Sequence, residues 1–552
     1  REATVLRLLR ERFDTWQDEG YLPSRRIEPG DKTDEPIRTR GWTHWHHLFN
    51  PRQLLTLGLL RRESDSLEIP EGRARILLEI GKMADLRGVG CKLLAWNSHS
   101  SKEMHSRVFM NQALNTLVSY CHRPLNSVLD IDDKSAKIYG GDSVTVADAR
   151  QLETSCDLWI TDPPYADAIN YHELSEFFLA WYAKPLERLF PEWATDSKRA
   201  LAITGDEEDF RRDMVESYRN LTNHMPNDGA QIVMFTHQDA RVWADLTLIL
   251  WAAGLRVTAA WTVATETRSA LKKGNYVQGT VLLVLRKRTT ESTAFPDDVQ
   301  MDIEDEVKVQ LDAMEALDAD EEERSFGETD YQLAAYAAAL RVITQHSAIA
   351  GWDIERELSR ARTASDPSPI ETLINDAVEI ATNHRIPDGI EPFYWNSLRP
   401  VERFYLKGLD LERSGDFRTG SYQALARGFG LDTYTPLLAR STANATRLQN
   451  ATEFGTALLD ASADGFAGSH VRHALYAMHE TRAQQDAQAG LQFLREEAPH
   501  YEQNRKTLVA ILAYLARLRT ALDAWAEDGR YANLVRGAVE NDTTTALGLS
   551  SL

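Results

Sequence analysis

The stretch Asp157-Leu158-Trp159-Ile160-Thr161-Asp162-Pro163-Pro164-Tyr165 decides how the middle of the chain folds. Its apolar first half predicts a β-strand, and the two consecutive prolines predict a stiff turn that ends this strand. The apolar spacing that follows predicts a helix from about Tyr171 to Trp181. In an open α/β sheet, ligands bind outside the carboxyl ends of the strands, so the turn is a candidate functional site.

The segments downstream extend this pattern into a sheet. Strands are predicted at 231–236, 256–263 and 278–286, and a helix is predicted at 240–253. Alternation of strands and helices favours a mainly parallel, doubly wound α/β sheet. The last two strands have no helix between them and predict an antiparallel hairpin at one edge.

The residues of the turn suit methylation of a planar amino group. The lone pair of an exocyclic amine on adenine or cytosine is delocalised, and two acceptors on its hydrogens would draw the nitrogen towards a tetrahedral geometry. The Asp162 carboxylate is one acceptor, and the Pro163 carbonyl, aimed by the stiff Pro163-Pro164 turn, is the second. Tyr165 offers an aromatic face for a base rotated out of the stack. The alternative is a plain strand-to-loop turn with a capping Asp.

Asp162–Tyr165 resembles the (D/N)PP(Y/F) signature of amino-group methyltransferases that use S-adenosylmethionine. The longer stretch 161–178 is similar to large bacterial adenine-specific DNA methylases found in anti-phage defence gene clusters, and so are the shorter stretches 49–54, 111–114 and 399–405. The resemblance implies a Rossmann-like class I methyltransferase sheet with a helical insertion and a C-terminal all-helical domain.

The same resemblance implies a function. The chain would make N6-methyladenine in double-stranded DNA, with the target base flipped and S-adenosyl-L-methionine as the methyl donor. Methylation would mark host DNA, while an ATPase, helicase or nuclease partner acts on unmarked phage DNA.

Two acidic residues are candidates for the cofactor side of the site. By the resemblance, Asp148 in Ala147-Asp148-Ala149 matches a strand-end motif whose Asp approaches the adenine amine of the cofactor. Asp142 in Gly140-Gly141-Asp142 is a rival for that role. Each could instead be an ordinary loop or capping Asp.

The glycine-rich cofactor loop of the family is absent from the sequence. None of the glycine pairs follows a convincing strand and opens a helix, as such a loop must; they are Gly88-Val89-Gly90, Gly140-Gly141 and Gly428-Phe429-Gly430. The simplest explanation is that the first two strands lie on an upstream segment or on a second polypeptide. A degenerate methylase that binds its cofactor weakly is the other explanation.

Length and composition argue against several other classes of protein. The 552 residues are 43% hydrophobic and 26% charged, which is typical of globular protein rather than of a disordered or membrane protein. No apolar run approaches the roughly 20 residues of a spanning helix. The spacing of Cys91, Cys121 and Cys156 predicts neither a disulfide scaffold nor a cysteine zinc site, and rare cysteine indicates the cytoplasm.

The chain is predicted to have four parts. They are a helical N-terminal and insertion region (1–135), a catalytic α/β domain whose first strands lie elsewhere (136–290), an acidic linker (291–326) and a helical C-terminal domain (327–552).

The formal net charge of −21 is unevenly placed. Residues 291–325 hold 14 Asp and Glu against Lys308 and Arg324. Such a run predicts a solvated linker or an exposed helix; the alternative is a nucleic-acid mimic or a dock for a basic partner. An acidic chain binds nucleic acid poorly in general, although a local basic groove is compatible with the remaining charge.

Three smaller clusters carry weaker predictions. The histidines of Trp42–His47 are not spaced for one metal ion, so no metal is predicted, and a loop or base-contacting patch is favoured. Basic residues of the nearby loop could contact phosphate: Arg25, Arg26, Lys32, Arg38 and Arg40. The loop between the last two strands, 265–275, could reach the DNA backbone or be a solvated hairpin tip.

Other functions remain open. N4-cytosine, an RNA base and a protein glutamine amide are planar amines or amides that suit the same motif. The chain could also be a DNA-binding scaffold without catalysis, whose helical C-terminal third binds defence partners.

Overall fold

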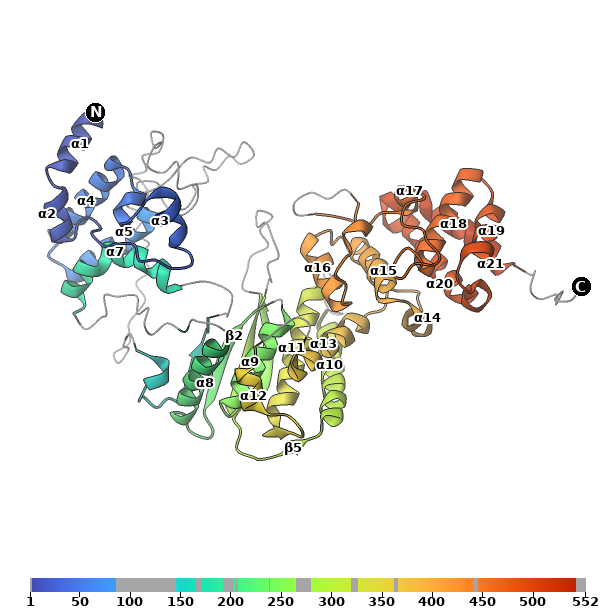
Figure 1. Cartoon of the computed structure of the whole chain (residues 1–552), viewed down its shortest axis with the longest axis horizontal. Coiled ribbons are helices and arrows are strands. Elements are labelled where there is room, and N and C mark those ends of the chain that lie inside the picture. Colours follow the sequence, from blue (N-terminus) through green and yellow to red (C-terminus); the bar gives the residue numbers. More distant parts are fainter. Residues whose placement is uncertain are drawn as a thin grey trace, which may run out of the picture. The chain divides into compact units, whose positions relative to one another are not determined.

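The chain divides into two units that interleave along the sequence. One comprises Arg1–Leu152 with Pro164–Thr204, and the other comprises Glu153–Pro163 with Gly205–Leu552. The fold is mixed α/β and mostly helical, with a small mixed sheet in the second unit (Figure 1). The computed structural model describes residues 2–85, 145, 147–164, 171–191, 203, 207–237, 239–264, 279–318, 326–361, 366–439 and 445–542.

The first unit is helical. Its helices are α1 (Glu2–Arg10), α2 (Phe13–Glu19), α3 (Asp34–Arg40), α4 (Pro51–Asp65), α5 (Pro70–Asp85) and α7 (Tyr171–Leu189), with short 3₁₀ turns at η1 (Trp45–Leu48) and η3 (Ala149–Gln151). Helix α3 lies within the stretch that was expected to be a loop with basic residues, and Arg38 and Arg40 belong to this helix.

The stretch 49–54 forms the start of α4. Asn50 caps the helix by accepting a hydrogen bond from Gln53 N at 2.9 Å, and the Gln53 side chain accepts one from Asn50 N at 2.7 Å. Pro51 follows at the first helical position, where its missing N–H costs nothing. Further along α4, a Cβ on Gly58 would lie 2.6 Å from the Trp16 ring, so glycine allows α2 to approach.

Helix α7 packs within the first unit. Phe177 and Trp181 are buried in one apolar cluster with residues of the N-terminal helices. The Phe177 ring stacks on Phe49 with a centroid distance of 6.1 Å, and Trp181 meets Phe49 edge-on at 5.2 Å. The apolar stripe of this helix therefore forms core with partners about 130 residues upstream in the sequence.

The second unit is built on a four-stranded sheet. Its strands are β1 (Leu158–Thr161), β2 (Ala230–Phe235), β3 (Leu255–Ala264) and β4 (Gly279–Lys287), in the spatial order β1-β2-β4-β3. The pair β1–β2 is parallel, and β4 is antiparallel to both β2 and β3. Strands β1, β2 and β3 therefore run in one direction, and their carboxyl ends lie at one edge of the sheet.

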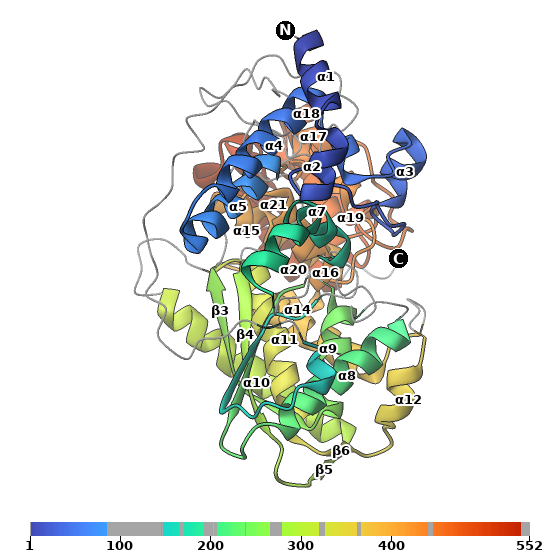
Figure 2. The same cartoon turned by 90° about the vertical axis from the view of Figure 1, so that its left-hand side faces the viewer.

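The two faces of this sheet differ. Helices α8 (Glu207–Asn223), α9 (Ala240–Ala252) and α11 (Glu328–Gln345) lie on one side (Figure 2), and Val233, Phe235 and Leu283 are buried on that face. On the other face, Leu158, Ile160, Trp261 and Val263 are 40–62% exposed. The described sheet thus has one packed face and one apolar face that is largely open.

The acidic segment is not a linker where it is described. Residues Pro296–Asp318 form helix α10, which contacts α11 and α13 (Pro369–His384). Its Val299, Ile303, Val307 and Leu311 are buried at a spacing of four residues, and the carboxylates of the helix lie outside this stripe. Of the two forms predicted for the charge run, a solvated linker or an exposed helix, the helix describes this part of the segment.

Further helices complete the second unit. A short parallel pair joins β5 (Thr293–Ala294) to β6 (Ala348–Ile349). The remaining helices are α12 (Ile354–Ser359), α14 (Pro392–Ser397), α15 (Pro400–Arg413), α16 (Thr419–Gly428), α17 (Ala451–Phe454), α18 (His470–Gln484), α19 (Ala487–Glu497), α20 (Tyr501–Ala521) and α21 (Asp528–Glu540), with 3₁₀ turns η5 (Thr435–Leu437) and η6 (Asp523–Trp525).

The C-terminal helices have a core of their own. One apolar cluster runs from Ile390 to Val539 and includes Trp395, Phe404 and Trp525. Helices α11 and α13 lie upstream of that cluster, and α11 packs on β3 and α9. The layer that covers the sheet therefore extends past residue 327, where a separate helical domain was predicted to begin.

None of the helices in the described ranges has both the length and the hydropathy that crossing a bilayer requires.

Candidate active site

The predicted strand-end turn lies where β1 leaves the sheet. Thr161 pairs with Val233, so β1 ends two residues before β2, which ends at Phe235. Asp162 and Pro163 follow Thr161 at the edge that holds the carboxyl ends of the parallel strands. Pro164 begins the next segment of the first unit, so the motif is the point where the chain passes from one unit to the other.

Both acceptors assigned to this turn are available. Asp162 is exposed and Pro163 is half-buried. Within the described part of the chain, neither the Asp162 carboxylate nor the Pro163 carbonyl has a hydrogen-bond partner. Two adjacent oxygens at this strand end can therefore accept hydrogen bonds from a bound group.

Tyr218 of α8 supports the strand end and was not predicted from the sequence. Its hydroxyl lies 3.2 Å from Thr161 Oγ1, the residue before Asp162. Burial raises the pKa of Tyr218, the Thr161 hydrogen bond lowers it, and the nearby negative charge of Asp162 raises it further. Tyr218 therefore stays neutral, and its contact with Thr161 fixes the last residue of β1. Its place among the apolar positions of α8 gave no sign of this contact.

The end of β2 at the same edge is closed by local hydrogen bonds. Asp239 caps α9 by accepting from Arg241 N at 2.9 Å, and Nδ1 of His237 accepts from Asp239 N at 3.0 Å. The Trp243 indole donates to the His237 carbonyl at 2.9 Å. This turn is held by its own contacts, and the buried Trp243 connects it to the packed face of the sheet.

The Asp148 carboxylate binds a residue close to it in the sequence, Arg150. It lies in the first unit, and its carboxylate caps η3 by accepting from Arg150 N at 3.0 Å. The Arg150 guanidinium also donates to both carboxylate oxygens, at 3.0–3.2 Å. The Arg150 side chain is the main cause of the lowered pKa of Asp148. Because Arg150 occupies both oxygens, the observed conformation is that of a capping residue.

The remaining predicted positions are placed only in part. Tyr165, Asp142, the loop 265–275 and the glycines at 88–90 and 140–141 lie outside the described residues. Gly428-Phe429-Gly430 is described: Gly428 ends α16, and Gly430 has a φ of +63°. This sequence is a helix C-terminus and has the wrong context for a phosphate-binding loop.

The histidines near the start of the chain are held by the protein itself. His46 Nδ1 lies 3.1 Å from the Pro23 carbonyl, His47 Nδ1 accepts from Thr43 N at 3.1 Å, and His44 Nδ1 lies 2.9 Å from Thr43 Oγ1. The neighbouring Arg25 is paired with the buried Glu176 at 3.2 Å. That arginine therefore anchors the loop to α7 and is not free to contact a phosphate.

One group of possible metal ligands is found among the described residues. Asp312, Glu315 and His384 bring their ligand atoms within 4.8 Å of one another. His384 Nε2 already lies 3.3 Å from Asp312, and Arg385 pairs with Glu315 at 3.5 Å. These contacts describe a surface ion-pair network between α10 and the end of α13.

Comparisons with protein families, with curated proteins and with solved structures find nothing that matches this chain.

Proposed function

We propose that the chain is an S-adenosylmethionine-dependent DNA methyltransferase that acts on an exocyclic amine, with adenine N6 as its target. The observation that carries the proposal is the pair of unpartnered acceptors, the Asp162 carboxylate and the Pro163 carbonyl, at the carboxyl end of a parallel strand. The resemblance of 161–178 to adenine-specific DNA methylases selects the substrate. A Rossmann-like methyltransferase sheet also fits the order β1-β2-β4-β3, in which the last strand is inserted antiparallel between its two predecessors.

The proposed chemistry needs alignment more than a strong base. Hydrogen bonds from the two amine hydrogens to Asp162 and Pro163 would draw the nitrogen towards a tetrahedral geometry and localise its lone pair on the nitrogen for attack on the methyl group. The Asp162 carboxylate would then stabilise the positive charge that develops on the nitrogen and hold the proton that the nitrogen releases. S-adenosylmethionine supplies an electrophilic methyl group when bound.

The described residues do not by themselves make a cofactor site. The Asp148 carboxylate is occupied by Arg150, and the described Gly-x-Gly sequence ends a helix. We therefore assign the substrate side of the reaction to this turn and no step to a described cofactor residue.

The sheet itself offers a place for the rest of the site. Among the described residues, β1 pairs only with β2, and its Leu158 and Ile160 are 49% and 62% exposed. A strand added at the free edge of β1 would continue the parallel sheet, and a helix following it would cover the open apolar face. We propose that strands outside the described residues, on this or a second polypeptide, complete the cofactor side there.

The test is methyl transfer to DNA by Asp162→Ala and by a matched control, Asp157→Ala. Both aspartates are exposed and lie at opposite ends of β1, so neither change should alter thermal unfolding. Loss of the acceptor at Asp162 should lower the transfer rate by about 10²- to 10³-fold. Full activity of Asp162→Ala, measured with labelled S-adenosylmethionine and nucleoside mass spectrometry, would sink the assignment.

The same product analysis separates the alternative substrates. Recovery of N4-methylcytosine, a methylated RNA base or a methylated glutamine would keep the motif chemistry and change the target. In the defence setting that the resemblance implies, the methylated DNA would be the host's, and an ATPase, helicase or nuclease would be the partner.

A catalytically incomplete DNA-binding scaffold is the second candidate, and the half-open sheet favours it. Calorimetry with S-adenosylmethionine distinguishes the two, first on the 552-residue chain and then on any longer product of the gene. Binding by either protein supports the enzyme, whereas binding by neither supports the scaffold or a site completed by a second polypeptide.

A further inference from the structure

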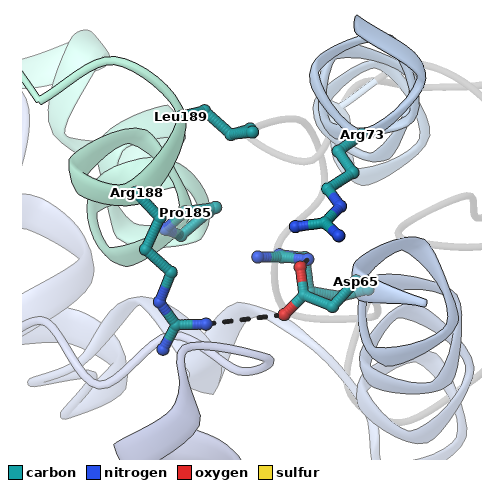
Figure 3. Close-up of a pocket in the computed structure, with 6 residues that line it drawn as sticks. Asp65, Arg73, Pro185, Arg188 and Leu189 are labelled. Atoms are coloured by element: carbon teal, nitrogen blue, oxygen red, sulfur yellow. Dashed lines mark hydrogen bonds and ion pairs between the residues drawn. The ribbon is translucent and has the colours of Figure 1, made fainter. Parts of the chain in front are cut away.

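Three arginines surround a small cavity in the first unit. The cavity has a volume of about 220 Å³ and lies between α4, α5 and α7 (Figure 3). Its lining residues are Arg61 and Asp65 of α4, Arg73 of α5, and Pro185, Arg188 and Leu189 of α7. All three helices belong to one unit, so the arrangement does not depend on how the units are placed.

The charges around the cavity do not balance. Asp65 is the carboxylate among the six lining residues, and it faces three guanidinium groups. It accepts a hydrogen bond from Arg61 Nη1 at 2.5 Å and lies 3.5 Å from Arg188 Nη1. One negative charge against three positive charges gives the six lining residues a formal charge of +2.

Arg61 is a buried cation with an unmet donor. The residue is 3% exposed, and its guanidinium carbon lies 5.7 Å from the centre of the Tyr21 ring. Nη1 donates to Ser64 Oγ at 2.8 Å and to Asp65, but Nε has no acceptor in the described part of the chain. A buried donor without an acceptor costs free energy, which a bound acceptor would recover.

Arg73 and Arg188 add further guanidinium donors beside the cavity. Arg73 Nε donates to the Leu67 carbonyl at 2.5 Å, which holds the side chain in place, and its Nη groups have no partner among the described residues. The Arg188 side chain is 59% exposed and reaches Asp65 from the opposite side (Figure 3). Guanidinium groups from two helices therefore approach the same space.

We propose that this cavity binds a phosphate group, either free or on a nucleic-acid backbone. The planar guanidinium fork matches the geometry of phosphate oxygens, and a net charge of +2 suits a doubly charged anion. The cavity is smaller than the roughly 300–1,000 Å³ of sites for drug-sized ligands, so it fits one small anionic group. Its residues lie in a different unit from Asp162, and the proposal does not depend on methyl transfer.

The experiment compares three variants of the full chain: Arg73→Gln, Arg188→Gln and the control Arg62→Gln. Arg62 is next to Arg61 on α4, is not a lining residue, and pairs with Glu63. Thermal unfolding is measured while sodium phosphate is titrated against sodium chloride at equal ionic strength. A second arm measures binding of a fluorescent DNA duplex as a function of salt.

If the ligand is free phosphate, we expect sodium phosphate to raise the unfolding temperature of the wild type and of Arg62→Gln. The two cavity variants should then need at least about tenfold more phosphate for the same rise. If the ligand is the backbone of a nucleic acid, we expect the cavity variants to bind the duplex more weakly than the wild type. The slope of their binding constant against salt concentration, on logarithmic axes, should be smaller by about one, and Arg62→Gln should behave like the wild type. The proposal is refuted if neither arm separates the cavity variants from Arg62→Gln. Arg188→Gln keeps this outcome meaningful if Arg73→Gln unfolds, because Arg188 is mostly exposed.

Discussion

Replacing Glu173 with glutamine should loosen the loop that α7 holds, by about 2–3 kcal/mol. The Glu173 carboxylate is 2% exposed, and its Oε2 accepts hydrogen bonds from Lys32 N, Thr33 N and Thr33 Oγ1, each at 3.0 Å. A hydrogen bond to a charged group contributes about 1 kcal/mol more than a neutral one, and three bonds to one oxygen are not fully additive. Glutamine keeps the shape of glutamate and lacks its charge. The difference in the free energy of local opening between the wild type and Glu173→Gln therefore measures the contribution of the charge.

Hydrogen exchange read by mass spectrometry is the suitable assay, because it reports local opening in a protein of two units. Since about 1.4 kcal/mol corresponds to a factor of ten, backbone amides around Lys32 and Thr33 should exchange about 30- to 150-fold faster in Glu173→Gln. Glu28→Gln is the matched control, because Glu28 is exposed in the same loop. Peptides from the second unit should be unchanged in both variants.

Unchanged exchange in Glu173→Gln would refute the reasoning, and so would an equal loss of protection in Glu28→Gln. A second variant approaches the same contact from the loop. A Cβ on Gly30 would lie 2.6 Å from Glu173 Oε2, so Gly30→Ala should displace the carboxylate and expose the same amides.

Glu412 and His46 are buried groups that should make stability depend on pH in opposite directions. Burial raises the pKa of Glu412 from 4.5 to about 7, against the lowering effect of hydrogen bonds from Leu448 N and Tyr422. The contribution of Glu412 to the stability of the second unit should therefore be greatest below pH 4.5 and fall by about 3 kcal/mol as the pH rises to 7. The difference in urea unfolding free energy between the wild type and Glu412→Gln should change by about this amount across that range, and a difference that does not vary with pH would contradict the assignment. Burial, helped by the positive charge of His47, lowers the pKa of His46 from 6.5 to about 4, so the stability of the first unit should be intact above pH 6.5 and fall by about 2 kcal/mol towards pH 4. Hydrogen exchange in peptides near His46 measures this loss, which His46→Gln should abolish.

The strands could be predicted from the sequence better than their order. The apolar runs at 158–161, 231–235 and 256–263 were found because period and β-branched content are local properties. The antiparallel hairpin was also expected. Insertion of β4 between β2 and β3 was not, because pairing depends on contacts between residues far apart in the chain.

The dependence on contacts between distant residues also limits what the sequence predicts about the packing of the helices. The buried stripe of α10, with Val299, Ile303, Val307 and Leu311, is visible in the sequence at a spacing of four, but the surrounding charge run dominated its interpretation. For α7 the spacing predicted a helix and could not say that residues of the N-terminal helices bury its Phe177 and Trp181.

For the candidate site, the sequence predicted which residues form the strand-end turn. It did not predict which residues contact that turn. Asp162 and Pro163 lie at a strand end, as expected, because the motif itself contains both the strand and the turn. Tyr218 contacts this turn from 56 residues downstream of Asp162, and no local pattern marks it. Asp148 shows the opposite case: its partner is Arg150, two residues away, and this short-range contact was visible in the sequence as an Asx-type cap.

The position of β1 connects the fold to the proposed chemistry. Catalytic groups must be held within about 0.5 Å of their working geometry. Strand β1 has four residues, one described neighbour and two exposed apolar side chains, so one side of it is unsupported. The Tyr218 contact fixes Thr161 from the packed face, and no described residue does the same from the free edge. A strand that pairs with this edge would therefore bury Leu158 and Ile160 and aim Asp162 in the same step, which makes cofactor binding and correct placement of the acceptors two consequences of one completed sheet.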